Sequence, residues 1–170
     1  FSHNGRLLSN ILETLPRDLL YQDDESALIR LAQGVLDLQA RSRVALFLLP
    51  DPFKRFVQAL VYVPREGYDT QLRLSLQRLI EEAAGGHVIG QTVLVNDSAL
   101  ARFHLVVTRP LHAPPIDVRA LEARLARAAR GWGEELAEQL ALSQGEESAR
   151  TLLARYAKAF PAAYREAVSP

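Results

Sequence analysis

The sequence predicts an α+β fold, in which pairs of strands alternate with helices. Short apolar runs of strand length occur in two pairs, at residues 44–49, 56–63, 88–95 and 101–108. The first pair is separated by the turn-forming Pro50-Asp51-Pro52 and the second pair by Asn96-Asp97-Ser98. A stretch with the 3.6-residue apolar spacing of a helix follows each pair. The middle of the chain therefore has the order ββαββα.

The two helices of this unit are indicated by their apolar spacing and their end signals. Residues 69–84 place Leu72, Leu76 and Ile80 on one face. Asp69 or Thr70 is the expected N-cap, and Gly85-Gly86 the expected stop, with a C-cap role rather than a phosphate-binding one. The second helix is expected as one long element over residues 116–141.

Helices are also expected on both sides of this unit. Residues 4–22 and 24–40 carry apolar residues at helical spacing and predict a helical hairpin, and a last helix is expected to begin near Glu146. We therefore expect three parts: an N-terminal helical hairpin at 1–41, an α+β domain at 42–141 and a helical extension at 142–170.

The connections determine which sheet these strands can form. Each hairpin pairs its own two strands, and helix 69–84 crosses from strand 56–63 toward the second hairpin. We expect the spatial order 44–49, 56–63, 101–108, 88–95, with the two central strands parallel. This is a ferredoxin-like four-stranded sheet, antiparallel or mixed, whose last strand has moved to the front of the sequence.

Strand 56–63 is apolar on both faces, whereas a strand with one wet face should alternate. The two following helices can cover only one face of the sheet. We expect Phe56, Leu60 and Tyr62 to form an interface on the other face. Its partner is the N-terminal helices, a second copy of the chain or a neighbouring domain.

The composition excludes several functional classes. Twenty basic and twenty acidic residues cancel, which argues against nucleic-acid binding. There is no cysteine, and no apolar run approaches the ~20 residues that span a bilayer, so we expect no thiol chemistry and no membrane partner. Because the chain starts at Phe1 and contains no methionine, we interpret it as a piece of a longer polypeptide.

No set of residues has the pattern of a catalytic or metal site. The four histidines show no metal-ligand spacing, and His104, inside strand 101–108, is expected to be a hydrogen-bonded strand residue. No serine lies in a G-x-S-x-G context, and no nucleotide-binding glycine motif is present. We therefore predict no catalytic residue, no metal site and no cofactor-binding residue in this chain.

Four stretches resemble the large bacterial type of NAD-specific glutamate dehydrogenase. They are RFVQALVYVPREGYDTQLRLSLQRLI at 55–80, SALARFHLVVTRP at 98–110, LEARLARAARGWGEEL at 121–136 and GEESARTLLARYAKAFPAAYRE at 145–166. The resemblance implies an ACT-like domain, which is a ferredoxin-like fold. It also implies a cytoplasmic, homo-oligomeric parent enzyme that deaminates glutamate to 2-oxoglutarate with NAD, and other domains of that polypeptide as partners.

Two functions remain open for the chain itself. In the first it is a non-catalytic scaffold that holds domains or subunits together. In the second it senses an amino acid at the loop between strand 56–63 and helix 69–84, where Arg65, Gly67 and a free helix N-terminus could hold the effector's carboxylate. An independent enzyme is disfavoured, because nothing assembles a nucleophile, a base and an orienting group.

Overall fold

The computed structural model describes residues 13, 15, 25–40, 43–156 and 159. Backbone contacts divide the chain into two compact units, residues 1–126 and 127–170. The expected helix at 4–22 lies outside the described residues, apart from residues 13 and 15. The expected second helix is observed as α3, Glu25–Ala40.

The first unit contains the four-stranded sheet. Its strands are β1 (Ala45–Pro50), β2 (Phe56–Pro64), β3 (Val88–Leu94) and β4 (Leu100–Thr108). They lie in the order β1-β2-β4-β3, which is the order that the sequence predicts. The α+β, ferredoxin-like fold class is thereby confirmed.

One part of the predicted topology is wrong: the two central strands are antiparallel. In the observed register Phe56 pairs with Thr108 and Pro64 with Leu100. The right-handed crossover through the helix makes β2 parallel to β3, the strand that the helix leads into. The β3–β4 hairpin then reverses the chain, so that β4 enters between them antiparallel to both.

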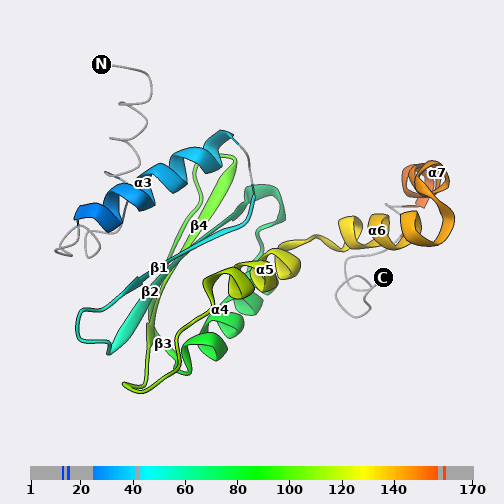
Figure 1. Ribbon diagram of the computed structural model, residues 1–170. Helices are drawn as coiled ribbons and strands as arrows, with labels where there is room; N and C mark the ends of the chain where they lie inside the picture. Colours follow the sequence, from blue (N-terminus) through cyan, green and yellow to red (C-terminus); the bar gives the residue numbers. More distant parts are fainter. Residues whose placement is uncertain (1–12, 14, 16–24, 41–42, 157–158, 160–170) are drawn as a thin grey trace, which may run out of the picture. The chain divides into compact units, whose positions relative to one another are not determined.

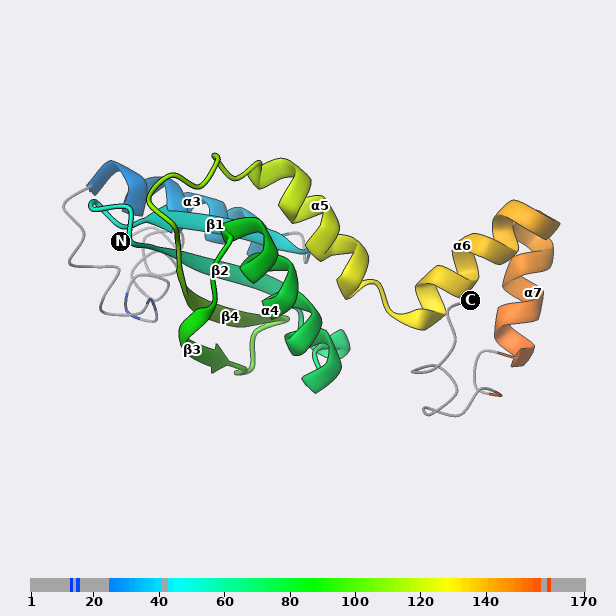
Figure 2. The ribbon, with the colours of Figure 1, turned by 90° about the horizontal axis from the view of Figure 1, so that it is seen from below.

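Both faces of the sheet are covered, as Figure 1 and Figure 2 show. Helix α3 lies on one face, and α4 (Thr70–Ala84) and α5 (Val118–Ala129) lie on the other. On the first face Leu60 and Tyr62 belong to a single core cluster with Leu31, Val35 and Leu38 of α3. The apolar second face of β2 therefore has a partner within the chain.

The contact of α3 with β1 is close because Gly34 has no side chain. A Cβ at Gly34 would lie 2.5 Å from Cε1 of Phe47, whose ring fills that space. The same ring makes an edge-on contact with Tyr62, with ring centroids 5.9 Å apart. An aromatic pair of this geometry contributes about 0.5–1.5 kcal/mol beyond the area that it buries.

The opposite face is closed by α4 and α5. Leu72, Leu76 and Ile80 of α4 are buried, as are Leu121 and Leu125 of α5. Burying each of these side chains stabilises the fold by roughly 1.5–3 kcal/mol. An exposed ion pair, Arg124 Nη2 to Glu82 Oε2 at 2.7 Å, also joins the two helices.

The ends of α4 are those that the sequence predicts. The carboxylate of Asp69 accepts a hydrogen bond from the Leu72 backbone N–H at 2.7 Å, which is an N-cap. Gly85 has φ = 69° and accepts the left-handed conformation that ends the helix.

The expected long helix 116–141 is wrong, because it is two helices. Helix α5 ends at Ala129, and α6 (Trp132–Gln144) begins after Gly131, whose extended backbone (φ −65°, ψ 148°) forms the N-cap. Two glycines within Gly131-Trp132-Gly133 each disfavour a helix interior by about 1 kcal/mol relative to alanine. In the second unit α6 packs with α7 (Glu146–Tyr156), the helix expected near Glu146.

The α3 face of the sheet can be tested with Leu60→Lys. Leu60 is fully buried, so the lysine would place a charge in the core, and we expect unfolding at room temperature or a loss of several kcal/mol. Urea denaturation followed by circular dichroism measures this loss. The matched control is Leu111→Lys, because Leu111 is 65% exposed and its change should cost under about 0.5 kcal/mol. Equal effects of the two changes would contradict the described packing.

Candidate functional site

The loop after β2 is a short 3₁₀ turn, η1 (Arg65–Gly67), that is bound to the β3–β4 turn. The backbone N–H of Arg65 donates to the Ala99 carbonyl, and its guanidinium Nη1 donates to the Asn96 carbonyl, both at 2.9 Å. Arg65 and Gly67 are exposed. The arginine that the sequence predicts as an effector ligand therefore connects two loops.

The N-terminus of α4, next to this loop, is not free. The carboxylate of Asp69 already occupies the position that an effector carboxylate was expected to take. Tyr68 lies between them, half-buried, and burial raises the pKa of its hydroxyl. That hydroxyl is enclosed and has no hydrogen-bond partner among the described residues.

Strand β1 forms one edge of the sheet and presents backbone groups outward. The Leu46 N–H donates to Oε2 of Glu122 on α5 at 2.8 Å, and Glu122 also lies 3.7 Å from Nη1 of Arg43. Backbone groups of alternate residues point to the same side, so Leu48 presents its N–H and C=O outward as well. At Pro50 the outward N–H is missing altogether.

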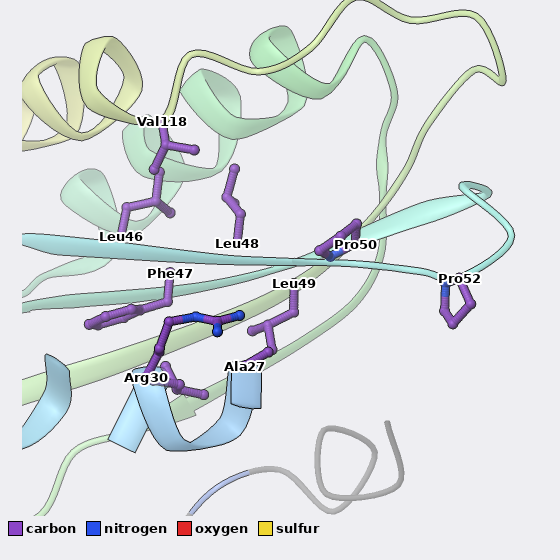
Figure 3. Close-up of a pocket in the computed structure, with 10 residues that line it drawn as sticks. Ala27, Arg30, Leu46, Phe47, Leu48, Leu49, Pro50, Pro52 and Val118 are labelled. Carbon is purple, nitrogen blue, oxygen red and sulfur yellow. The ribbon is translucent and has the colours of Figure 1, made fainter. Parts of the chain in front are cut away.

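An apolar groove surrounds this edge (Figure 3). Its volume is about 770 Å³. Leu46, Leu48 and Val118 lie on one side of β1, and Phe47 and Leu49 lie on the other. An extended segment placed here would find both backbone hydrogen bonds and apolar contacts, which is the geometry of β-strand addition.

The opposite edge strand, β3, exposes both apolar and polar side chains and carries no charge. Ile89 and Val93 are exposed on it, and Val95 is exposed just after it. Monomeric proteins usually protect edge strands with charges, prolines or bulges. In β3 the only such feature is an irregularity of the register between Val88 and Gly90.

A buried polar strip crosses the α3 face of the two central strands. Nε2 of His104 lies 2.9 Å from Oε1 of Gln58, which confirms the expected hydrogen-bonded strand histidine. Arg102 lies two residues before His104 on β4 and opposite Tyr62 on β2. Burial raises the pKa of Tyr62, and the adjacent Arg102 partly offsets this rise. Arg102 is not among the residues predicted from the sequence, because the apolar pattern of β4 does not reveal that a charged side chain there is buried.

The described part of the chain holds no group of three or more histidine, aspartate or glutamate side chains that could bind a metal ion. No described helix is both long enough and apolar enough to cross a membrane.

The fold and its flanking helices define the class of the protein. The sequence model of a protein family, the glutamate dehydrogenase ACT2 domain, matches residues 45–133. The sheet with α4 and α5 is therefore an ACT domain. Models of helical motifs 1 and 2 of glutamate dehydrogenase match residues 1–41 and 135–170. The chain belongs to the family of large NAD-specific glutamate dehydrogenases.

Three curated relatives are each called NAD-specific glutamate dehydrogenase. The protein of Halomonas elongata is 39% identical over 96% of this chain. Those of Pseudomonas aeruginosa and Mycobacterium tuberculosis are 33% and 34% identical over 99% of it. The aligned region is only 10%, 10% and 11% of these proteins, so the chain spans about a tenth of their length.

The turn that joins β1 to β2 should respond to acid. The hydrogen bond from the Arg55 side chain, at 3.1 Å, is the main cause that lowers the pKa of Asp51 below its ordinary value of 3.8. The stabilisation is therefore present above about pH 4 and is lost as the pH falls through the lowered pKa. Asp51→Asn should lower the melting temperature at pH 7, and the difference from wild type should shrink in acid.

Arg55→Gln removes the same hydrogen bond from the other partner and should show the same pH dependence. Thermal melts between pH 7 and pH 2 measure both variants. A difference between wild type and Asp51→Asn that stays constant over this range would contradict the assignment.

Proposed function

We propose that this chain is a non-catalytic scaffolding and regulatory segment of a large dehydrogenase, and that it holds domains or subunits of that enzyme together. The observation that carries the proposal is the apolar edge of β1, whose outer side pairs with no described strand, together with its groove between α3 and α5. The partner is another part of the same long polypeptide or of a second subunit. The chain aligns with about a tenth of its relatives' length. About nine-tenths of such a polypeptide could therefore contain the partner.

The proposed parent oxidises glutamate to 2-oxoglutarate with NAD, as a homo-oligomer in the cytoplasm. The names of the three relatives support the substrate and the cofactor. NAD would bind elsewhere in the polypeptide, since no nucleotide-binding motif occurs in this sequence. The predicted interface of Phe56, Leu60 and Tyr62 remains part of the proposal; Leu60 and Tyr62 have their observed contacts with α3.

Amino-acid sensing at Arg65 and Gly67 is the alternative function. One observation favours it: the guanidinium of Arg65 is exposed and uses one N–H for the Asn96 carbonyl. An arginine side chain has five N–H donors, so others remain for a carboxylate. The capped N-terminus of α4 counts against this site, because Asp69 would repel an anion there.

The scaffold proposal is tested with Leu48→Lys in the full-length enzyme. A lysine on a free edge strand blocks strand addition, and Leu48 is only half-buried, so the fold should persist. We expect mass photometry to show loss of the assembled form or a looser particle. The control is Leu111→Lys, at an exposed residue outside the groove. Unchanged assembly in both variants, with normal melting of each, would exclude the β1 edge as a contact.

The sensing alternative is tested by thermal melts of the chain with each common amino acid. A ligand at a hundred times its Kd adds about 2.7 kcal/mol, which raises the melting temperature by several degrees. A rise that Arg65→Ala abolishes would support sensing at this loop. If no amino acid raises the melting temperature, the sensing alternative fails and the scaffold proposal is unaffected.

A further inference from the structure

The buried arginine of the polar strip, Arg102, makes no ion pair with any residue that the structure describes. Only 8% of Arg102 is exposed, and its Nε is enclosed without a hydrogen-bond partner among the described residues. The ion pairs found in the described part of the chain join other arginines to carboxylates. Its neighbour across the β2–β4 pair is Tyr62, and the next pair on the same face of the sheet is Leu60 with His104.

Tyr62 does not neutralise this charge. The phenol lies opposite Arg102 in the strand register, but burial raises the phenol's pKa, so it stays protonated and neutral at physiological pH. Arginine, unlike lysine or histidine, does not lose its proton when it is buried. The guanidinium therefore remains a cation that is largely removed from water, which is strongly unfavourable unless an anion is nearby.

The ligand that fits is a carboxylate. A guanidinium presents N–H donors in a planar fork that matches the two oxygens of a carboxylate, and such pairs are the strong, geometrically specific ones. The strip adds further polar side chains on the same face, because His104 lies two residues along β4 and is hydrogen-bonded to Gln58. Gln58 and His104 therefore make this part of the α3 face polar.

We propose that Arg102 anchors a carboxylate-binding site on the α3 face of the sheet. The carboxylate comes either from a small organic acid or from an acidic side chain of the remaining polypeptide. The site is separate from the Arg65 loop and from the β1 edge groove, and the proposal does not rest on the scaffolding function. If the carboxylate site is disproved, the scaffolding proposal is unaffected, and the reverse also holds.

The first arm of the test uses the chain itself. Thermal melts are recorded with glutarate, 2-oxoglutarate and L-glutamate, against glutaramide and sodium chloride of equal ionic strength as uncharged and salt controls. At a hundred times Kd we expect a rise of roughly 5–10 °C with a carboxylate and none with glutaramide. Arg102→Met, which removes the charge but keeps the stem, should abolish the rise.

Two matched variants locate the effect. Arg119→Met removes an arginine that is exposed on α5 and should leave the rise unchanged. Arg65→Ala should leave it unchanged as well, which separates this site from the loop after β2. Arg102→Lys keeps the charge without the fork, and we expect it to bind about ten-fold more weakly.

A measurement on the wild-type chain keeps the test valid if the Arg102 variants do not fold. The arginine Nε–Hε signals in a proton–nitrogen NMR spectrum report directly on the enclosed Nε. The Arg102 signal should shift on titration with glutarate and should stay in place with glutaramide.

The second arm distinguishes the source of the carboxylate. If it comes from the remaining polypeptide, Arg102→Met should lower the melting temperature of the full-length enzyme by several degrees. The same change should leave the isolated chain as stable as before or more so, and small carboxylates should have no effect on the full-length protein. Arg119→Met is again the control.

The proposal is overturned by the remaining outcomes. One is that no carboxylate affects the wild-type chain and that Arg102→Met destabilises chain and full-length enzyme equally, as expected if Arg102 is only a packing neighbour of Tyr62. The other is that Arg102→Met changes neither protein and the Nε–Hε signal does not move.

Discussion

The structure of the first unit depends on the pairing of β2 with β4. Both strands are buried on both faces, from Val57 to Val63 on β2 and from Leu100 to Leu105 on β4. A ferredoxin-like sheet has its own two helices on one side only, so a sheet with such central strands requires a further layer. Helix α3 provides that layer, and the absence of a side chain at Gly34 lets the Phe47 ring lie between α3 and β1. Helix α3, which lies within the N-terminal helical motif, thus shares a hydrophobic core with the sheet of the ACT domain.

Because both faces carry helices, the two edge strands, β1 and β3, are the places where another strand can pair with this sheet. On β1 the carboxylate of Glu122 accepts a hydrogen bond from one outward N–H, at Leu46. No described residue is found hydrogen-bonded to the outward backbone groups of Leu48, which lines the apolar groove. On β3 the exposed Ile89 and Val93 have no protecting charge on the same strand. A chain that served alone would be expected to protect such edges. The edges therefore agree with a segment that works inside a larger assembly.

The sequence predicts the strand positions and order well, because turn residues such as Pro50-Asp51-Pro52 and caps such as Asp69 and Gly85 act locally. The direction of β4 relative to β2 could also have been predicted. The crossover helix makes β2 parallel to β3, and the β3–β4 hairpin then makes β4 antiparallel to β2. The break between α5 and α6 at Gly131 could also have been predicted, because Gly131 and Gly133 are two glycines within three residues. The burial of Arg102 could not be predicted from the sequence. It depends on how Tyr62 and the elements packed on this face enclose one residue of β4, and the spacing of apolar residues carries no information about that.

Arg65 and Arg102 differ in how much each would gain from a carboxylate partner. Arg65 is exposed and hydrogen-bonds the Asn96 carbonyl, and water can satisfy its remaining N–H groups, so it gains little from a further partner. Arg102 is enclosed. Removing an ion from water costs several kcal/mol, unless an oppositely charged partner offsets that free energy. A ligand at Arg102 would recover part of that cost, whereas a ligand at Arg65 would have to displace water. Physical chemistry thus favours the face between the sheet and α3, rather than the loop after β2, as the place for an acidic partner.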